Sequence, residues 1–315
     1  MTIMSEIIPK RIFYVWDGPI PEKVATCIES WHKVMPDYEV IELNNHSSYF
    51  DFTGELNRCL WFQVVYERKL WAYVSDYIRV KSLLDHGGIY FDTDITALRR
   101  FDDFLHHDFF SGFESRELIC LSVFGCVPRH TLLEDIYEFY QKEIWHSPLY
   151  TIPEITTYIL RKKYKCIIYD SRRYAVPTQF GHVTLYPEKF FFPYRWNEAY
   201  ENTCITSDTH TIHWWGASWV KPEIIDWLAT KHLFSTLNKL NTGSNIQKIQ
   251  VHTGRKLKLE LLLFNRWSIL KAYKQANTVY VELLGIFPLM TVLYEKHSAL
   301  YYLFNRFHLY TRKYS

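Results

Sequence analysis

Two carboxylates lie two positions apart in the sequence, Asp92 and Asp94, directly after the apolar run 89–91. Carboxylate oxygens at this spacing form a compact site for a hard cation such as Mg²⁺ or Mn²⁺. Acidic pairs at strand ends are also common in ordinary turns, so the pair alone favours a structural role. The residues around the acidic pair favour the metal-binding role instead.

A segment just before the acidic pair carries side chains that suit a phosphate or a sugar. Ser75, Asp76 and Arg79 fall in an expected helix, and the i,i+3 spacing places Asp76 and Arg79 on one face. That face offers a carboxylate for sugar or ribose hydroxyls and a guanidinium for phosphate or sugar oxygens. The alternative is an ion pair on a solvated helix surface.

A histidine stands far along the chain in the sequence HWWGASW, residues 213–219. His213 can serve as a third metal ligand, while Ser218 and Trp219 offer a hydroxyl and an indole N–H to a metal-bound diphosphate. A lone histidine beside aromatic residues is otherwise more often part of a core.

The elements that must hold these residues alternate between strands and helices. We expect strands at 12–16, 38–43 and 89–91, and helices from Pro21 to near Pro36 and from Leu70 to a C-cap at Gly87 and Gly88. Strand–helix–strand units of this length predict a mainly parallel sheet with helices on both faces, the α/β class. Ligands bind such sheets beyond the carboxyl ends of the strands, so the loops after Trp16 and Phe91 form the candidate site.

The composition limits the class of protein. Of the 315 residues, 48% are apolar and 22% are charged, which excludes a globally disordered chain, and the net charge of +2 gives no general attraction to nucleic acid. Aromatic residues reach 18%, a surplus that suits sugar-stacking surfaces as well as core packing. The six cysteines form no paired motif, and the sequence shows neither a signal-peptide stretch nor an apolar run of about 18 residues, so we expect a cytoplasmic protein.

The last part of the chain differs from the rest in charge. Residues 245–315 contain 11 Lys and Arg against 3 Glu, a net charge of +8, which leaves residues 1–244 with a net charge of −6. We therefore expect one domain at 1–244, which carries the candidate site, and a basic, aromatic, helical extension at 245–315, divided at the polar stretch 241–245. The extension is either a cap that completes the fold or an interfacial helix that binds anionic lipid.

Four blocks of the sequence follow the order in which they occur in a known family. They are RIFYVWDG (11–18), VSDYIR (74–79), GGIYFDTD (87–94) and HWWGASW (213–219). With these blocks, about residues 8–220 closely resemble glycosyltransferase family 32, the DXD-containing sugar transferases of the capsular-polysaccharide and yeast mannosyltransferase type. They also resemble the catalytic domain of the large clostridial glucosylating toxins. Four ordered blocks are far more specific than any one of them.

The resemblance implies a GT-A fold, a single α/β domain that binds a nucleoside diphosphate, and retaining transfer from a nucleotide sugar with Mn²⁺ or Mg²⁺. Carried over by position, the resemblance implies that Val15 and Trp16 hold the base, and that Ser75, Asp76, Arg79 and Tyr90 contact the ribose and the donor sugar. It implies that Asp92, Asp94 and His213 hold the metal, and that Ser218 and Trp219 bind the leaving diphosphate. Ile152 and Ser122 depart from the family's pattern and are expected to line the sugar or acceptor pocket.

The expected chemistry is electrostatic, with Arg79, Asp92 and Asp94 as the catalytic residues. The metal and its neighbouring hydrogen-bond donors neutralise the charge that grows on the diphosphate as the anomeric bond breaks. Outside the acidic loop no carboxylate of the sequence stands out as a nucleophile, so we favour attack from the same face over a covalent intermediate on Glu114.

The expected donor is a UDP-sugar rather than a GDP-sugar, for example UDP-galactose, and the group moved is a hexose or an N-acetylhexosamine. The expected acceptor is a growing, lipid-linked cell-surface glycan, such as a capsular polysaccharide or an O-antigen, and the enzyme is expected to lie peripherally on the inner face of the plasma membrane. No nucleic-acid partner is expected.

Two alternatives stay open. A two-metal phosphohydrolase or nucleotidyltransferase could use Asp92 and Asp94, but it would need further carboxylates for a second metal. A non-enzymatic glycan-binding protein would explain the aromatic surplus but would leave the acidic pair and His213 without a role.

Overall fold

The computed structural model describes residues 7–115, 117–166, 172–179 and 181–216, the single residues 228 and 231, and six strand segments between 256 and 313. By its internal contacts the chain divides into two units, Met1–Trp219 and Val220–Ser315. The division predicted at 241–245 lies outside the described residues. The candidate site belongs to the first unit.

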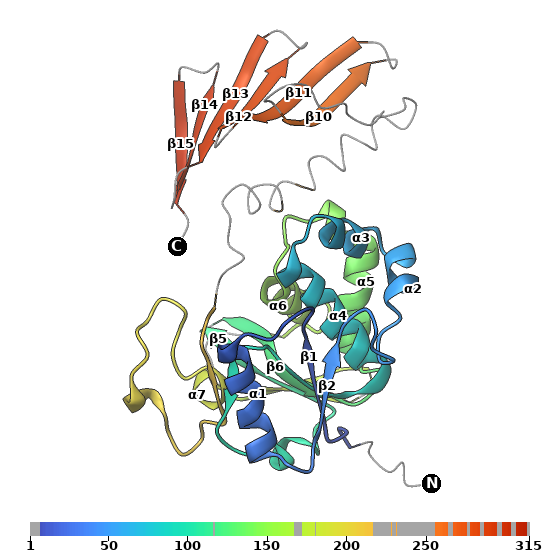
Figure 1. Cartoon of the computed structure of the whole chain (residues 1–315), viewed down its shortest axis with the longest axis vertical. Helices are drawn as coiled ribbons and strands as arrows, with labels where there is room; N and C mark the ends of the chain where they lie inside the picture. Colours follow the sequence, from blue (N-terminus) through green and yellow to red (C-terminus); the bar gives the residue numbers. More distant parts are fainter. Residues whose placement is uncertain are drawn as a thin grey trace. The chain divides into compact units, whose positions relative to one another are not determined.

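The first unit is built on a seven-stranded mixed sheet in the order β2-β1-β3-β6-β5-β8-β7 (Figure 1). Its strands are β1 (Arg11–Val15), β2 (Glu39–Leu43), β3 (Gly88–Phe91), β5 (Phe109–Ser115), β6 (Leu118–Cys126), β7 (Tyr174–Pro177) and β8 (His182–Tyr186). Strands β2, β1, β3, β5 and β8 run in one direction, and β6 and β7 run in the other. The mainly parallel α/β sheet predicted from the sequence is therefore confirmed, with β6 reversed at its centre.

Helices cover both faces of this sheet. They are α1 (Glu22–Val34), α2 (Phe52–Arg58), α3 (Leu60–Glu67), α4 (Trp71–His86), α5 (Thr131–Glu138), α6 (Ile152–Lys162) and α7 (Glu188–Phe191), with 3₁₀ turns at Asp102–Phe104, Ile144–His146 and Asn202–Cys204 and a π-helical turn at Phe139–Glu143. Figure 1 shows α2 to α6 gathered together, away from α1 and α7. Among the described residues, none of these helices combines the length and apolar character that crossing a membrane requires.

Strand β3 shows how the two faces are filled. Neighbouring side chains of a strand point to opposite faces, so Phe91 packs against Trp31 of α1 with ring centroids 5.4 Å apart. Tyr90 points to the other face, where its ring lies under the guanidinium of Arg79 from α4. The residue after Phe91 is the first carboxylate of the acidic pair, so a strand fixed on both faces carries it.

The turn between α4 and β3 needs glycine at two positions. The Gly87 N–H donates to the Leu83 carbonyl at 2.9 Å and closes the helix, with φ angles of 61° at Gly87 and 119° at Gly88. Side chains rarely adopt these angles, and a Cβ at Gly87 would lie 2.6 Å from the Pro128 ring. The predicted C-cap therefore forms, and it leads the chain from α4 directly into β3.

Two further strands, β4 (Ile95–Ala97) and β9 (Thr211–His213), form a separate antiparallel ribbon. The ribbon joins the acidic pair, which precedes β4, to the end of the first unit. The ribbon also packs against α1, whose Trp31 indole donates to the Ile95 carbonyl at 2.7 Å.

The second unit contains a six-stranded antiparallel sheet whose strands follow one another in sequence order. They are β10 (Lys256–Leu263), β11 (Trp267–Gln275), β12 (Thr278–Leu283), β13 (Phe287–Tyr294), β14 (Ser298–Leu303) and β15 (Phe307–Lys313). The helical extension predicted for this part of the chain is therefore wrong for these residues. The stretches KLKLEL (256–261) and TVYVEL (278–283) alternate polar and apolar residues with the period of two that is typical of strands.

Candidate active site

The acidic pair lies in a tight turn between β3 and β4, at the carboxyl edge of the sheet. The Asp92 N–H donates to the Ser122 carbonyl on β6 at 2.9 Å, and the Ile95 N–H donates to the Asp92 carbonyl at 3.1 Å. These bonds fix the backbone on both sides of Asp94, so the two carboxylates are held at the end of a central strand.

The ribbon of β4 and β9 brings the distant histidine to this turn. Its register places His213 opposite Ile95, the residue after Asp94, and His213 Nε2 lies 3.1 Å from Asp94 Oδ1. The chain beyond His213 stays with the same aspartate. The Trp214 N–H donates to the Asp94 carbonyl at 3.0 Å, and the Gly216 N–H donates to Asp94 Oδ2 at 2.9 Å.

Asp92, Asp94 and His213 together fit a divalent cation. Each offers one ligand atom, and these three atoms all lie within 4.8 Å of one another. Two carboxylates and one imidazole form a mixed oxygen and nitrogen set that suits Mn²⁺ or Mg²⁺. The imidazole nitrogen that faces Asp94 is Nε2, so Nε2 is the atom of His213 that would bind the ion.

The surroundings of Asp94 favour its charged form. Burial acts against ionisation, but the charge and hydrogen bond of His213 and the Gly216 N–H outweigh it, and the pKa of Asp94 is lowered. An ionised carboxylate is the form that binds a cation.

Arg79 of α4 contacts the first carboxylate of the acidic pair. Its Nη2 lies 2.9 Å from Asp92 Oδ1, and its Nη1 donates to Asp92 Oδ2 at 3.3 Å. The guanidinium also donates to Ser75 Oγ at 2.6 Å and to the Leu121 carbonyl at 3.0 Å, and its Cζ lies 4.4 Å from the centroid of the Tyr90 ring. Because Arg79 is only 4% exposed, the alternative of an ion pair on a solvated helix surface is excluded.

Asp76 lies one helical turn from Arg79 and shares its buried environment. Asp76 Oδ1 is 3.2 Å from Arg79 Nη2. Burial is the main cause that raises the pKa of Asp76 to about 7, with Arg79 opposing the shift and the charge of Asp92 adding to it. The N–H of Ile152, at the start of α6, also bonds to Asp76. The buried carboxyl of Asp76 is therefore harder to ionise than that of an exposed aspartate.

Val15 and Trp16 lie at the end of β1, on the same edge of the sheet as the acidic pair. The Trp16 N–H donates to the Leu43 carbonyl at 3.3 Å. Its indole N–H reaches two carbonyls of its own loop, Gly18 at 3.1 Å and Pro19 at 3.2 Å, and the half-buried ring is thereby oriented. That this ring stacks on a base stays a prediction. Ser218 and Trp219, expected at the diphosphate, lie outside the described residues.

Several neighbours of the site are supplied by β5, β6 and α6. The carbonyls of Leu121 and Ser122 bind Arg79 and Asp92 through the backbone, so no side-chain pattern in the sequence could reveal them. Glu114, near the end of β5, interacts electrostatically with His213, and burial raises the pKa of this carboxyl. Ser122 and Ile152, the two departures from the family's pattern, thus lie next to Asp92 and Asp76.

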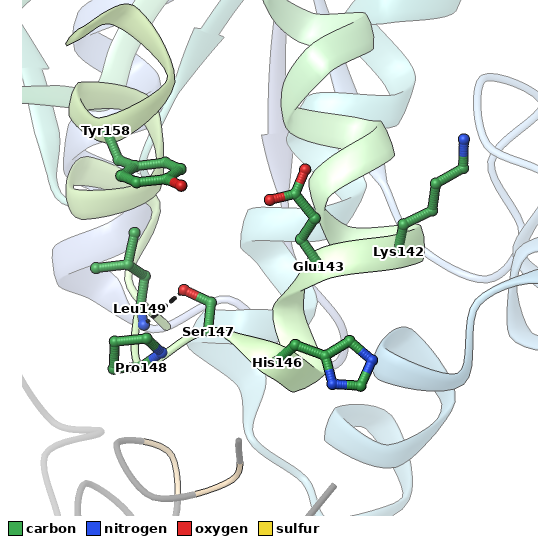
Figure 2. Close-up of a pocket in the computed structure, with 7 residues that line it drawn as sticks. All are labelled: Lys142, Glu143, His146, Ser147, Pro148, Leu149 and Tyr158. Carbon is green, nitrogen blue, oxygen red and sulfur yellow. Dashed lines mark hydrogen bonds between the residues drawn. The ribbon is translucent and has the colours of Figure 1, made fainter. Parts of the chain in front are cut away.

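A surface pocket elsewhere in the first unit is separate from these residues (Figure 2). Figure 2 shows the side chains of Glu143 and Tyr158 on opposite sides of it. The lining residues are Lys142, Glu143, His146, Ser147, Pro148, Leu149 and Tyr158. None of the residues predicted for the base, sugar, metal or diphosphate is among them.

The region around the acidic pair is similar to known proteins. Residues 21–111 match the family described as a glycosyltransferase sugar-binding region containing a DXD motif. The human protein alpha-1,4-N-acetylglucosaminyltransferase is 24% identical to this chain over 58% of the chain, and the match covers 62% of the human protein's length.

Two solved structures are similar in part. The PaToxG glycosyltransferase matches with a TM-score of 0.41 and 18% identity, over 51% of this chain and 70% of that one. A glycosyltransferase involved in the glycosylation of the major capsid of PBCV-1 matches with a TM-score of 0.35 and 10% identity, over 69% and 98%. Over part of its length, this chain is therefore similar to DXD-containing glycosyltransferases.

Proposed function

We propose that this protein is a retaining, metal-dependent glycosyltransferase that moves a hexose or an N-acetylhexosamine from a UDP-sugar, such as UDP-galactose, to a glycan. The observation that carries the proposal is the convergence of Asp92, Asp94 and His213 on one point beside the buried Arg79. The matched family region, residues 21–111, contains the acidic pair and Arg79.

The residues of the site divide the work of binding the donor. Asp92, Asp94 and His213 would hold Mn²⁺ or Mg²⁺, which when bound supplies positive charge to the diphosphate. Trp16 would stack on the uracil ring. Asp76 would accept hydrogen bonds from hydroxyls of the ribose or the donor sugar, for which a carboxylate is well suited. In our proposal Val15, Ser75 and Tyr90 line the same donor site, and Ser218 and Trp219 bind the diphosphate.

Arg79 serves the transfer step by fixing the charge of the site before the substrate arrives. Its bidentate contact holds Asp92 in one orientation, so little reorganisation is needed when negative charge grows on the leaving diphosphate. The bond from the anomeric carbon to the phosphate oxygen breaks and its electron pair stays with the diphosphate. The acceptor oxygen then bonds to the anomeric carbon from the same face, and its proton passes to the leaving phosphate oxygen.

The two alternative functions gain no support from the site. A two-metal phosphohydrolase needs a second group of ligands, and the described residues bring together one group of this kind, Asp92, Asp94 and His213. The interpretation as a glycan-binding protein without activity rests on the aromatic content alone and does not account for the contact of the buried Arg79 with Asp92.

We also propose an acceptor and a location. The acceptor would be a growing lipid-linked cell-surface glycan, such as a capsular polysaccharide or an O-antigen. The enzyme would lie on the inner face of the plasma membrane, attached through the second unit. The support for this location is the net charge of +8 on residues 245–315, because each basic residue near an anionic leaflet contributes about 1 kcal/mol of attraction.

A donor screen tests the function. The full-length protein is incubated with a panel of UDP- and GDP-sugars and Mn²⁺, and the nucleotide product is identified. We expect slow release of UDP from at least one UDP-sugar. Release of a nucleoside monophosphate would indicate a phosphohydrolase, and release of no nucleotide from any donor would contradict the proposal.

A further inference from the structure

An aromatic pair, the exposed Trp214 and the half-buried Tyr200, lies beside the metal-binding residues and has no part in the donor site. Trp214 directly follows His213 and is 43% exposed. Tyr200, in the segment that leads from α7 to β9, packs against it with ring centroids 5.1 Å apart at 57°. Exposed single apolar residues are ordinary, but a large aromatic surface next to a reactive site is more informative.

The indole of Trp214 is held in one place. Its backbone N–H donates to the Asp94 carbonyl at 3.0 Å, and its ring N–H donates to Thr96 Oγ1 on β4 at 2.8 Å. Tyr200 is fixed in turn, since its hydroxyl donates to Asn202 Oδ1 at 2.9 Å and its ring contacts Tyr194. A surface that is already ordered loses little conformational entropy when it binds a ligand.

The backbone reverses after Trp214, and this reversal separates two neighbouring tryptophans. Trp215 has a φ of 53°, which a bulky residue rarely adopts. Its ring packs on His213 at 4.0 Å, and its indole N–H donates to the Tyr194 carbonyl at 3.1 Å. One indole is thereby placed against the metal ligand, while the indole of Trp214 stays exposed. Such strain is found where the surrounding structure or a function requires it.

We propose that Trp214 and Tyr200 form the acceptor subsite, where they stack on a pyranose ring of the glycan that receives the sugar; this rests on the proposed function. The C–H bonds on one face of a pyranose pack well against the negative face of an aromatic ring. The donor-binding residues Asp76 and Arg79 approach the acidic pair through Asp92, whereas Trp214 approaches through Asp94. A sugar stacked on Trp214 therefore lies beside the metal ligands, where the acceptor hydroxyl must be delivered.

An oligosaccharide array tests the subsite. The full-length protein is applied with MnCl₂ and UDP to an array that includes capsular and O-antigen fragments, and UDP affinity is measured separately by calorimetry. The variants are Trp214→Ala, Trp214→Phe and, as the matched control, Trp196→Ala, which removes a tryptophan of 52% exposure from the segment that also carries Tyr200.

We expect the wild-type protein to retain at least one glycan. Trp214→Ala should reduce retention at least tenfold more than it reduces UDP affinity, Trp214→Phe should keep part of it, and Trp196→Ala should match the wild type. Tyr200→Ala repeats the test if Trp214→Ala does not fold by circular dichroism.

The subsite is wrong if the wild type retains no glycan or if the alanine variants retain as much as the wild type. The subsite is also wrong if Trp214→Ala reduces UDP affinity by the same factor as it reduces glycan retention. Failure of the proposed function would be seen separately, as the absence of UDP release by the wild type in the donor screen.

Discussion

Removing Arg79 tests how tightly the charges of the site are coupled. Arg79→Ala would leave Asp76 and Asp92 without the cation that neutralises both, and would leave the Leu121 carbonyl without its donor. Breaking a buried ion pair by removing one partner costs about 3–5 kcal/mol. For a folded unit of this size 1 kcal/mol corresponds to about 2–4 °C in Tm, so we expect the Tm to fall by roughly 6–20 °C.

Differential scanning calorimetry of the full chain at neutral pH measures this shift. Arg100→Ala is the matched control, because Arg100 pairs with Asp37 and Asp102 at 2.6 Å each but does so at the surface, where ion pairs contribute little to stability. Arg79→Lys keeps the charge but not the bidentate contact and should fall between the two. A Tm of Arg79→Ala within about 2 °C of the wild type would show that the buried ion pairs of Arg79 contribute less to stability than the inferred value of about 3–5 kcal/mol.

The other predictions concern the base, the buried carboxyl and the basic segment. Trp16→Ala should weaken UDP binding by about one to two decades, since stacking contributes about 1–3 kcal/mol per base; an unchanged affinity in calorimetry would refute the stacking role. In the folded state the pKa of Asp76 is raised to about 7, whereas in the unfolded chain it has its ordinary value of 3.8. Between about pH 4 and 7 the folded state therefore binds a proton that the unfolded state has lost, so the contribution of Asp76 to the free energy of unfolding falls as the pH rises. The Tm of Asp76→Asn relative to the wild type should therefore rise over this range, while the contributions of His107 and His130, whose pKa values burial lowers to about 4, cancel in the difference; a constant difference would contradict the shift. The full protein should sediment with phosphatidylglycerol vesicles at low salt and be released at high salt. Charge reversal at Arg255, Lys256 and Lys258 should abolish this binding, and undiminished binding would show that the segment only completes the fold.

The framework of the site could be predicted because its signals are local. Strand β3 is an apolar run, and Gly87 and Gly88 stand where the chain must take positive φ angles. These features place the acidic pair at a strand end without any knowledge of distant contacts. The family resemblance then added the order of the blocks, which local signals do not provide.

Contacts between distant residues could not be derived from local patterns. His213 reaches Asp94 only because β9 pairs with β4 in one register, and nothing in the spacing of the two residues encodes that pairing. In the same way, the helical spacing of Asp76 and Arg79 does not tell whether their side chains are buried. Helix α4 is covered by α3, α5 and the sheet, and it lacks the polar face that identifies a surface helix.

At the end of the chain a local strand pattern was present, but the prediction followed charge and aromatic content instead. The alternation in KLKLEL, residues 256–261, indicates a strand, yet charge and aromatic content favoured an interfacial helix. The strands β10, β12 and β14 end at residues 263, 283 and 303, so the hairpins also follow a 20-residue period in the sequence. Charge and aromatic content are properties of a surface and are compatible with either secondary structure.

Metal binding by Asp94→Ala tests the central claim most directly. Mn²⁺ binding is followed by electron paramagnetic resonance in the presence of UDP, and UDP release from the best donor of the screen is measured in parallel, for the wild type, Asp94→Ala and the surface control Asp37→Ala. We expect the wild type and the control to bind Mn²⁺ and release UDP, and the wild type in EDTA to release none. Asp94→Ala should keep its fold by circular dichroism but lose both Mn²⁺ binding and UDP release. Undiminished Mn²⁺ binding and UDP release by Asp94→Ala would contradict the assignment of this site.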